Sequence, residues 1–118
     1  MRKTYNKLIR DRIPDIIAAA GRQYAVEAMD ETPFLSALAA KLVEEAQEAQ
    51  AALLAGDRQE ILKELADLAE VLDTVLEHRE IAAEELRACQ LERREARGGF
   101  GRRLRLAIRR RRLTFVEF

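Results

Sequence analysis

The sequence predicts a mainly α-helical (all-α) fold, in which two long helices form an antiparallel hairpin in a four-helix-bundle-type core. Apolar residues recur every three or four positions through most of residues 33–97, which is the period of an amphipathic helix. The chain is 48% hydrophobic and 36% charged, a balance that suits such helices and argues against a disordered protein. Its 118 residues are the length of one domain, and we expect residues 1–118 to form a single one.

The first predicted element is a short helix that begins at Pro14. Proline suits a first helical position, and Gly21 suits the residue after a helix end. Residues 23–29 then alternate apolar and polar side chains, which is typical of a short strand. Residues 104–108 alternate in the same way. We therefore expect a minor β-hairpin or short strands near the N- and C-terminal segments.

Local signals also place two long helices and a third one after them. Thr32, followed by a proline, is a suitable N-cap, and Gly56 is suited to end the helix that begins there. Asp57 opens a capping box for the next helix, which we expect to run through Leu76. A third helical stretch covers residues 81–97.

Charge and cysteine content narrow the functional classes. The net charge is zero, but acidic residues gather in the middle of the chain and arginines between Arg93 and Arg112. The single cysteine cannot form a disulfide within the chain, which fits a reducing compartment. No apolar run is long enough to span a membrane, and the first residues lack an apolar signal core. We therefore expect a cytoplasmic protein that has no membrane partner.

Acidic residues occupy unusual positions on the two long helices. On a wheel of about 100° per residue, Glu45 falls inside the apolar arc by roughly 20°, and Glu48 falls about 40° outside it. Glu64 and Asp67 repeat these two offsets on the next helix. Because only two residues separate the helices, we expect a hairpin that brings the four carboxylates together.

Such a group of carboxylates would need a cation. Two like charges about 4 Å apart repel by roughly 4 kcal/mol at an effective dielectric of 20. Oxygen ligands favour a hard ion, Mg2+ or alternatively Mn2+, whereas zinc would use His or Cys, of which the chain has one each. The alternative is that the acids are solvated helix charges, with Lys41 pairing with Glu45 and Lys63 with Asp67 at i,i+4.

Four short motifs point to a known family. Residues 44–48 read EEAQE and residues 64–67 read ELAD. Residues 5–17 read YNKLIRDRIPDII, and residues 97–100 read RGGF. The first two resemble the E-E-x-x-E and E-x-x-D motifs of the MazG-like, all-α NTP pyrophosphohydrolases, a superfamily that includes phosphoribosyl-ATP pyrophosphohydrolase and dimeric dUTPases. The last two resemble motifs of its phosphoribosyl-ATP pyrophosphohydrolase-like branch.

The resemblance implies hydrolysis of a nucleoside triphosphate, or of a phosphoribosyl-ATP-like nucleotide, at the α–β bond to monophosphate and pyrophosphate. House-cleaning of aberrant nucleotides is one role that this activity serves. The metal ligands would be Glu45, Glu48, Glu64 and Asp67, with Mg2+ as cofactor. Glu44 or Glu48 would orient the attacking water. The cations expected to meet the substrate phosphates are Lys7, Arg10, Lys63 and Arg97.

Two further expectations concern partners. The second long helix has an apolar arc of roughly 220°, wider than one neighbouring helix can cover. We therefore expect a homodimer. Members of the resembled superfamily assemble as dimers or tetramers, so the resemblance implies a homodimer or homotetramer. The main alternative function is a non-enzymatic nucleic-acid-binding module that uses the arginine-rich segment 102–112. Its alternating apolar residues and its lack of aromatic residues favour a solvated strand over nucleic-acid binding.

Overall fold

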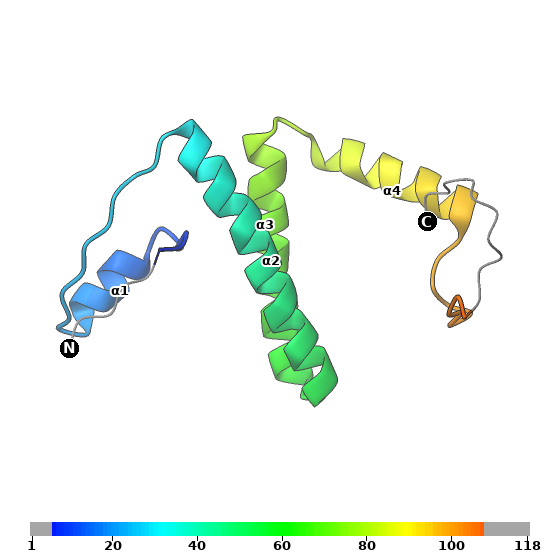
Figure 1. Ribbon diagram of the computed structural model, residues 1–118, viewed down its shortest axis with the longest axis horizontal. Helices are drawn as coiled ribbons and strands as arrows, with labels where there is room; N and C mark the ends of the chain where they lie inside the picture. The colour runs from blue at the N-terminus through cyan, green and yellow to red at the C-terminus, as the bar shows by residue number, and fades with distance from the viewer. Residues whose placement is uncertain (1–5, 108–118) are drawn as a thin grey trace. The chain divides into compact units, whose positions relative to one another are not determined.

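The computed structural model describes residues 6–107 of the chain. These residues form four helices and no strand, which confirms the predicted all-helical class (Figure 1). The helices are α1 (Ile13–Ala19), α2 (Glu31–Ala55), α3 (Arg58–His78) and α4 (Ala83–Arg97). The chain divides into two compact units, Met1–Ala83 and Glu84–Phe118, the first of which contains α1, α2 and α3.

The strands predicted from alternating side chains are absent from this part of the chain. Residues 23–29 are irregular and so are residues 104–107, while residue 108 and the arginines after it lie outside the described range. Alternation indicates only which side chains would share a face of a sheet. A strand also needs a neighbouring backbone to complete its hydrogen bonds, and within residues 6–107 neither segment pairs with one. The minor β-hairpin is therefore a wrong prediction for these residues.

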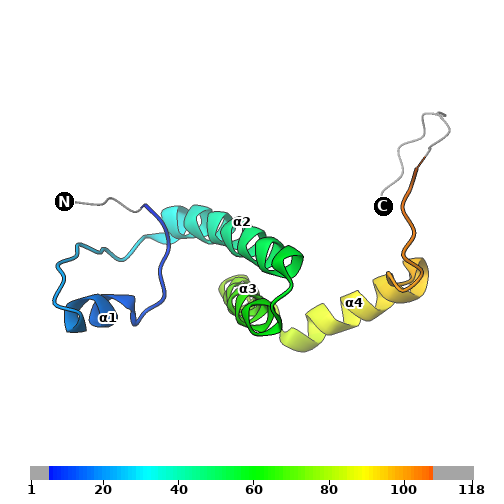
Figure 2. The same ribbon diagram turned by 90° about the horizontal axis from the view of Figure 1, so that it is seen from below.

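α2 and α3 form the predicted antiparallel hairpin, and they lie side by side in both views (Figure 1, Figure 2). Only Gly56 and Asp57 connect them. Gly56 has a φ of +91°, in the left-handed region, and its N–H donates to the Ala52 carbonyl over 3.0 Å, which ends α2. Asp57 caps α3, because its Oδ2 accepts a hydrogen bond from the Glu60 N–H at 3.2 Å. Each residue of the turn thus completes one helix end.

α2 begins earlier than the sequence predicts, because its N-cap is Asp30 and not Thr32. The backbone of Asp30 is extended, with φ −70° and ψ 173°, and its carbonyl accepts the Phe34 N–H at 2.9 Å. Pro33 therefore lies inside the first turn. It is tolerated there because the first N–H groups of a helix have no acceptor within the helix.

The two outer helices agree with the predicted ones apart from their first residues. α1 opens where the Ile13 N–H donates to the Arg10 carbonyl at 3.0 Å, and Gly21 follows its last turn. α4 begins at Ala83, two residues later than predicted, and ends before Gly98. No helix in the described range is long and apolar enough to cross a membrane.

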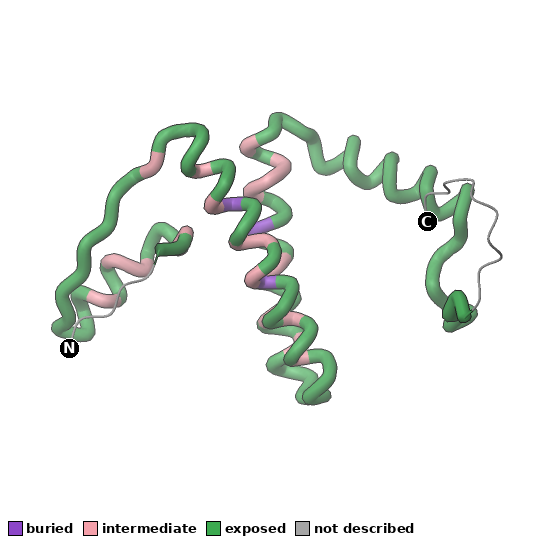
Figure 3. Tube along the Cα trace, viewed as in Figure 1, coloured by how far each residue is buried: buried purple, intermediate pink, exposed green. Residues whose placement is uncertain are grey.

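The core lies along the seam where α2 meets α3 (Figure 3). Among residues 6–107, the buried apolar side chains are Leu38 from α2 and Val71 from α3, and one charged residue, Glu45, is buried with them. Large apolar side chains on the same helices stay exposed, to 65% for Leu53 and 57% for Leu62. Two helices bury only the stripe between them, so much of the wide apolar arc of α3 remains uncovered.

A half-buried histidine lies at the end of the hairpin opposite the turn. His78, the last residue of α3, packs edge-on against Phe34 near the start of α2, with ring centroids 5.2 Å apart. Its side chain is 10% exposed, and its Nε2 lies 3.0 Å from Glu31 Oε1 without hydrogen-bond geometry. This contact joins the first turn of α2 to the last turn of α3. The two helices are therefore held together at the turn and at the opposite end of the hairpin.

We expect Gly56→Ala to lower the free energy of unfolding by about 1 to 2 kcal/mol, because a Cβ is strained at a positive φ even where space is open. The measurement is urea denaturation followed by circular dichroism. Gly101→Ala is the matched control, since its added Cβ also meets open space but its φ lies outside the positive range. Equal midpoints for the two variants would contradict this account of the turn.

Candidate metal centre

Three of the four predicted ligands converge where the two long helices face each other. Glu45 and Glu48 lie one turn apart on α2, and Glu64 lies on α3. Each offers a carboxylate oxygen, and these oxygens lie within 4.8 Å of one another. The oxygens Glu45 Oε2 and Glu64 Oε2 are buried and have no hydrogen-bond partner within the described residues. Buried polar atoms are nearly always paired, so these two oxygens point to a ligand that would complete them.

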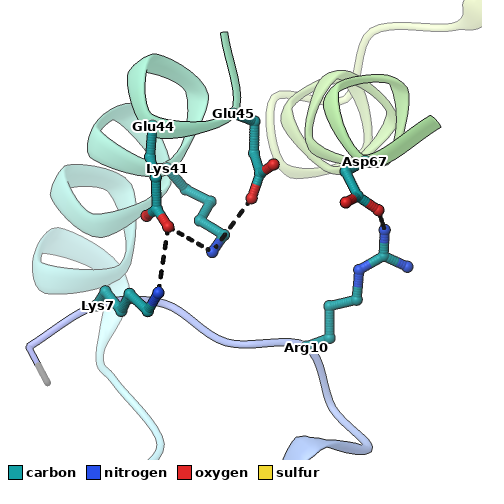
Figure 4. A network of polar contacts seen from close by, with 6 residues as sticks. All are labelled: Lys7, Arg10, Lys41, Glu44, Glu45 and Asp67. Carbon is teal, nitrogen blue, oxygen red and sulfur yellow. Dashed lines mark hydrogen bonds and ion pairs between the residues drawn. The ribbon is translucent and has the colours of Figure 1, made fainter. Parts of the chain in front are cut away.

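Asp67, the fourth predicted ligand, is not one of these three residues and instead faces Arg10 (Figure 4). Its Oδ1 accepts a hydrogen bond from Arg10 Nη2 at 2.8 Å. Arg10 belongs to the irregular segment before α1, so this contact joins residues 57 positions apart in sequence. The pairing of Asp67 with Lys63, which belonged to the alternative of solvated helix charges, is replaced by this long-range ion pair.

A lysine that the sequence suggested only as a helix partner lies beside the carboxylates. Lys41 Nζ is 3.4 Å from Glu45 Oε1 and 3.5 Å from Glu44 Oε1, and its side chain is 15% exposed. Glu44 Oε1 also accepts a hydrogen bond from Lys7 Nζ at 3.2 Å (Figure 4). The pairing of Lys41 with Glu45, which belonged to the alternative of solvated helix charges, is therefore present. Glu44 is neutralised by two ammonium groups.

These contacts give two adjacent carboxylates opposite electrostatic environments. Burial, followed by the charge of Glu48, raises the pKa of Glu45, and the nearby ammonium of Lys41 offsets this only in part. Burial also acts to raise the pKa of Glu44, but its hydrogen bond to Lys7 and the charge of Lys41 outweigh it, so the pKa is lowered. The ionised form of Glu45 is thus the under-compensated charge of the site, and a divalent cation would compensate it.

The remaining predicted phosphate-binding residues have other surroundings. Lys63 Nζ lies 3.2 Å from Glu60 Oε2 and 3.9 Å from Glu64 Oε1, so it borders the carboxylate group. The hydrogen bond to Glu60 is the main cause that raises the pKa of Lys63, which keeps it charged. Arg97 ends α4 in the second compact unit. The structure therefore brings three of the four predicted cations close to the acidic residues of the hairpin.

A helical hairpin with converging carboxylates on both helices defines a class of all-helical proteins whose site suits a divalent cation. The model of the family described as phosphoribosyl-ATP pyrophosphohydrolase matches residues 3–94, which include the hairpin and the N-terminal segment. The chain belongs to this family, and it is a nucleotide pyrophosphohydrolase, a hydrolase acting on acid anhydrides. Comparison with curated proteins gave no match, and comparison with solved structures gave none either.

We expect Glu45→Gln to raise the free energy of unfolding of the metal-free protein at neutral pH. Glu44→Gln should lower it by up to about 1 kcal/mol, the range of partly exposed ion pairs. The reason is that folding raises the pKa of Glu45, so its charge opposes folding, and lowers that of Glu44, so its charge favours folding. Urea denaturation in the presence of a chelator measures both variants, and each adjacent substitution serves as the control for the other.

Acidification checks the sign of these two effects. The stability that Glu44 contributes is present above its unfolded-state pKa and is lost as the pH falls through its lowered folded-state pKa. The penalty from Glu45 disappears as the pH falls through its raised folded-state pKa, so the gain in Glu45→Gln should shrink there. If both substitutions changed the free energy of unfolding at neutral pH in the same direction, the described charge environments would be wrong.

Proposed function

We propose that this pyrophosphohydrolase binds Mg2+ through Glu45, Glu48, Glu64 and Asp67. In this proposal it cleaves a nucleoside triphosphate, or a phosphoribosyl-ATP-like nucleotide, at the α–β bond to monophosphate and pyrophosphate. The observation that carries the proposal is the convergence of three carboxylates from two helices with two buried oxygens that lack partners. The family's description names a phosphoribosyl-ATP pyrophosphohydrolase, which supports the proposed cleavage at the α–β bond.

The donor set fits a hard divalent ion. All of its ligand atoms are carboxylate oxygens, which Mg2+ and Mn2+ prefer over softer ligands. Oxygens on opposite sides of Mg2+ lie about 4 Å apart, because each Mg–O bond is about 2.1 Å. The oxygens of Glu45, Glu48 and Glu64 lie within 4.8 Å of one another, so small side-chain rotations would suffice to bind an ion. Mn2+ is the alternative occupant of the same site.

The proposed chemistry assigns separate roles to the acidic residues. A bound divalent ion would polarise a phosphate group and lower the pKa of a coordinated water. Glu48 is exposed within the carboxylate group, so it can reach both an ion and a water from solvent. Glu44, the other predicted catalytic residue, is held by Lys7 and Lys41, which favours Glu48 as the residue that orients the attacking water.

Cations near the carboxylates would bind the phosphates of the nucleotide. Lys7 and Arg10 come from the segment before α1, and Lys63 comes from α3. Their positions beside the acidic residues support this role, because phosphates held next to these carboxylates would need positively charged partners there. We include Arg97 in the proposed set on the basis of its motif, and we propose that residues 1–118 act together as one domain.

We also propose that the protein assembles as a homodimer or homotetramer through the open face of α3. Leu62, Ala66 and Ala69 are exposed and follow one another at helical spacing. A second copy packed on this stripe would give the four-helix bundle that a single hairpin lacks. Such a twofold contact uses the same surface on both subunits, so one stripe suffices for closure.

With Mg2+ present, we expect pyrophosphate release from a panel of nucleoside triphosphates. Glu45→Gln and Glu64→Gln should each lower kcat/KM at least about 100-fold, because each removes a ligand of the ion that stabilises transition-state charge. The measurement is steady-state pyrophosphate release, with circular dichroism to confirm that the helices form. Asp73→Asn, an exposed acid on α3, is the matched control and should stay within about twofold of wild type. Wild-type rates in both site variants would refute the proposed site.

Sedimentation velocity at micromolar concentration is expected to give a dimer or tetramer for the wild-type protein. Leu62→Glu should shift the protein to monomer, because a charge would then lie in the contact between subunits. The subunit itself should still fold, because Leu62 is 57% exposed in the single chain. Val26→Glu adds the same charge at an exposed valine outside the helices and should leave the assembly unchanged. A wild-type monomer would remove the assembly from the proposal.

A further inference from the structure

The ion pair between Arg10 and Asp67 lies at the solvent-exposed border of the carboxylates. The guanidinium and the carboxylate are joined at 2.8 Å, but their side chains are 56% and 36% exposed. Exposed ion pairs contribute little to stability, since water solvates both charges and salt screens them. This pair can therefore open without disturbing the hairpin core.

Asp67 has a second cation within reach if the proposed site is occupied. It lies one helical turn after Glu64, whose carboxylate already belongs to the group of three. Residues three apart on a helix are neighbours on its surface, so Asp67 and Glu64 share one face of α3. A carboxylate that held both a divalent ion and a guanidinium would place these like charges close together, and their repulsion would act against an ion pair that contributes little by itself.

We propose that Arg10 is a displaceable counter-ion, which Asp67 exchanges for the divalent ion when the ion binds. The proposal rests on the ion site of the proposed function and deepens it, because it states how the fourth ligand is recruited. The guanidinium that Asp67 releases would then be free to bind the phosphates of the nucleotide. Ion binding would thereby prepare a phosphate-binding group, which favours binding of the ion before the triphosphate.

Contacts on both sides of the Arg10 side chain would hold the segment before α1 in place during this exchange. Lys7 Nζ holds Glu44 at 3.2 Å, so the segment stays attached to α2 when Arg10 leaves Asp67. Glu44 lies outside the group of three carboxylates, so its contact with Lys7 does not compete with the ion. On the other side, the Arg10 carbonyl accepts the Ile13 N–H at 3.0 Å, which ties the residue to the start of α1. Arg10 is therefore the part of the segment that can change partner.

A double-mutant cycle tests the exchange through ion affinity alone. Binding of Mn2+ without nucleotide is followed by the electron paramagnetic resonance signal of free Mn2+ for the wild type, Arg10→Ala, Asp67→Asn and the double variant. Arg10→Ala should bind Mn2+ about two- to fivefold more tightly, because Asp67 no longer has to leave a partner. In the Asp67→Asn background, removal of Arg10 should have no effect.

Arg12→Ala is the matched control, since it removes the same charge two residues away from an exposed position. It should change the affinity less than Arg10→Ala does. If Arg10→Ala binds Mn2+ more weakly than wild type, or only as tightly as Arg12→Ala, the exchange is refuted and Arg10 instead orients Asp67 toward the ion. If the wild-type protein binds no Mn2+, the proposed site and the exchange both fail, whereas binding without coupling removes the exchange alone.

Discussion

The interaction on which this structure depends is the burial of a carboxylate at the contact between its two long helices. Glu45 shares the seam with Leu38 and Val71, so the residues that hold the hairpin together and the residue that makes it acidic occupy the same small region. One oxygen of Glu45 faces Lys41, and the other has no hydrogen-bond partner within residues 6–107. A buried charge is tolerated only when it is compensated, which explains why cations from separate segments gather around these acids.

This arrangement divides the acidic residues by what already compensates them. Glu44 has two lysines and Asp67 has an arginine, and both of these residues lie outside the tight group. Glu45 and Glu64 each keep an oxygen without a hydrogen-bond partner in the described part of the chain, although a lysine lies near each. The carboxylates of Glu44 and Asp67 are thus neutralised by cations of the same chain, whereas the negative charge of Glu45 and Glu64 is compensated only in part. Under the proposed function, stability of the hairpin and affinity for a cation would therefore be opposed at this point, as is common at functional sites.

Local chemistry made much of the fold predictable. The turn at Gly56 and Asp57 follows from short-range signals, and the convergence of Glu45, Glu48 and Glu64 follows from helical period once the turn is known. The strand expected over residues 23–29 failed, because alternation does not reveal whether a partner strand exists. The pairing of Arg10 with Asp67 could not be predicted from the sequence either. An irregular segment has no periodic pattern that would indicate which residue, here 57 positions away, its side chains contact. The metal and catalytic roles of these residues stay predictions.

The two-residue connection between α2 and α3 has a consequence for how this chain tolerates changes in length. An inserted residue next to Gly56 or Asp57 would disturb the turn that completes both helix ends, and if α3 took it up, Glu64 would rotate by about 100° around the helix axis, away from its partners. The same insertion in residues 79–82, after the hairpin has closed at His78, would alter no helix phase within it. Relatives that keep this carboxylate group are therefore expected to vary in length at residues 79–82 and to keep the 56–57 turn at a fixed size.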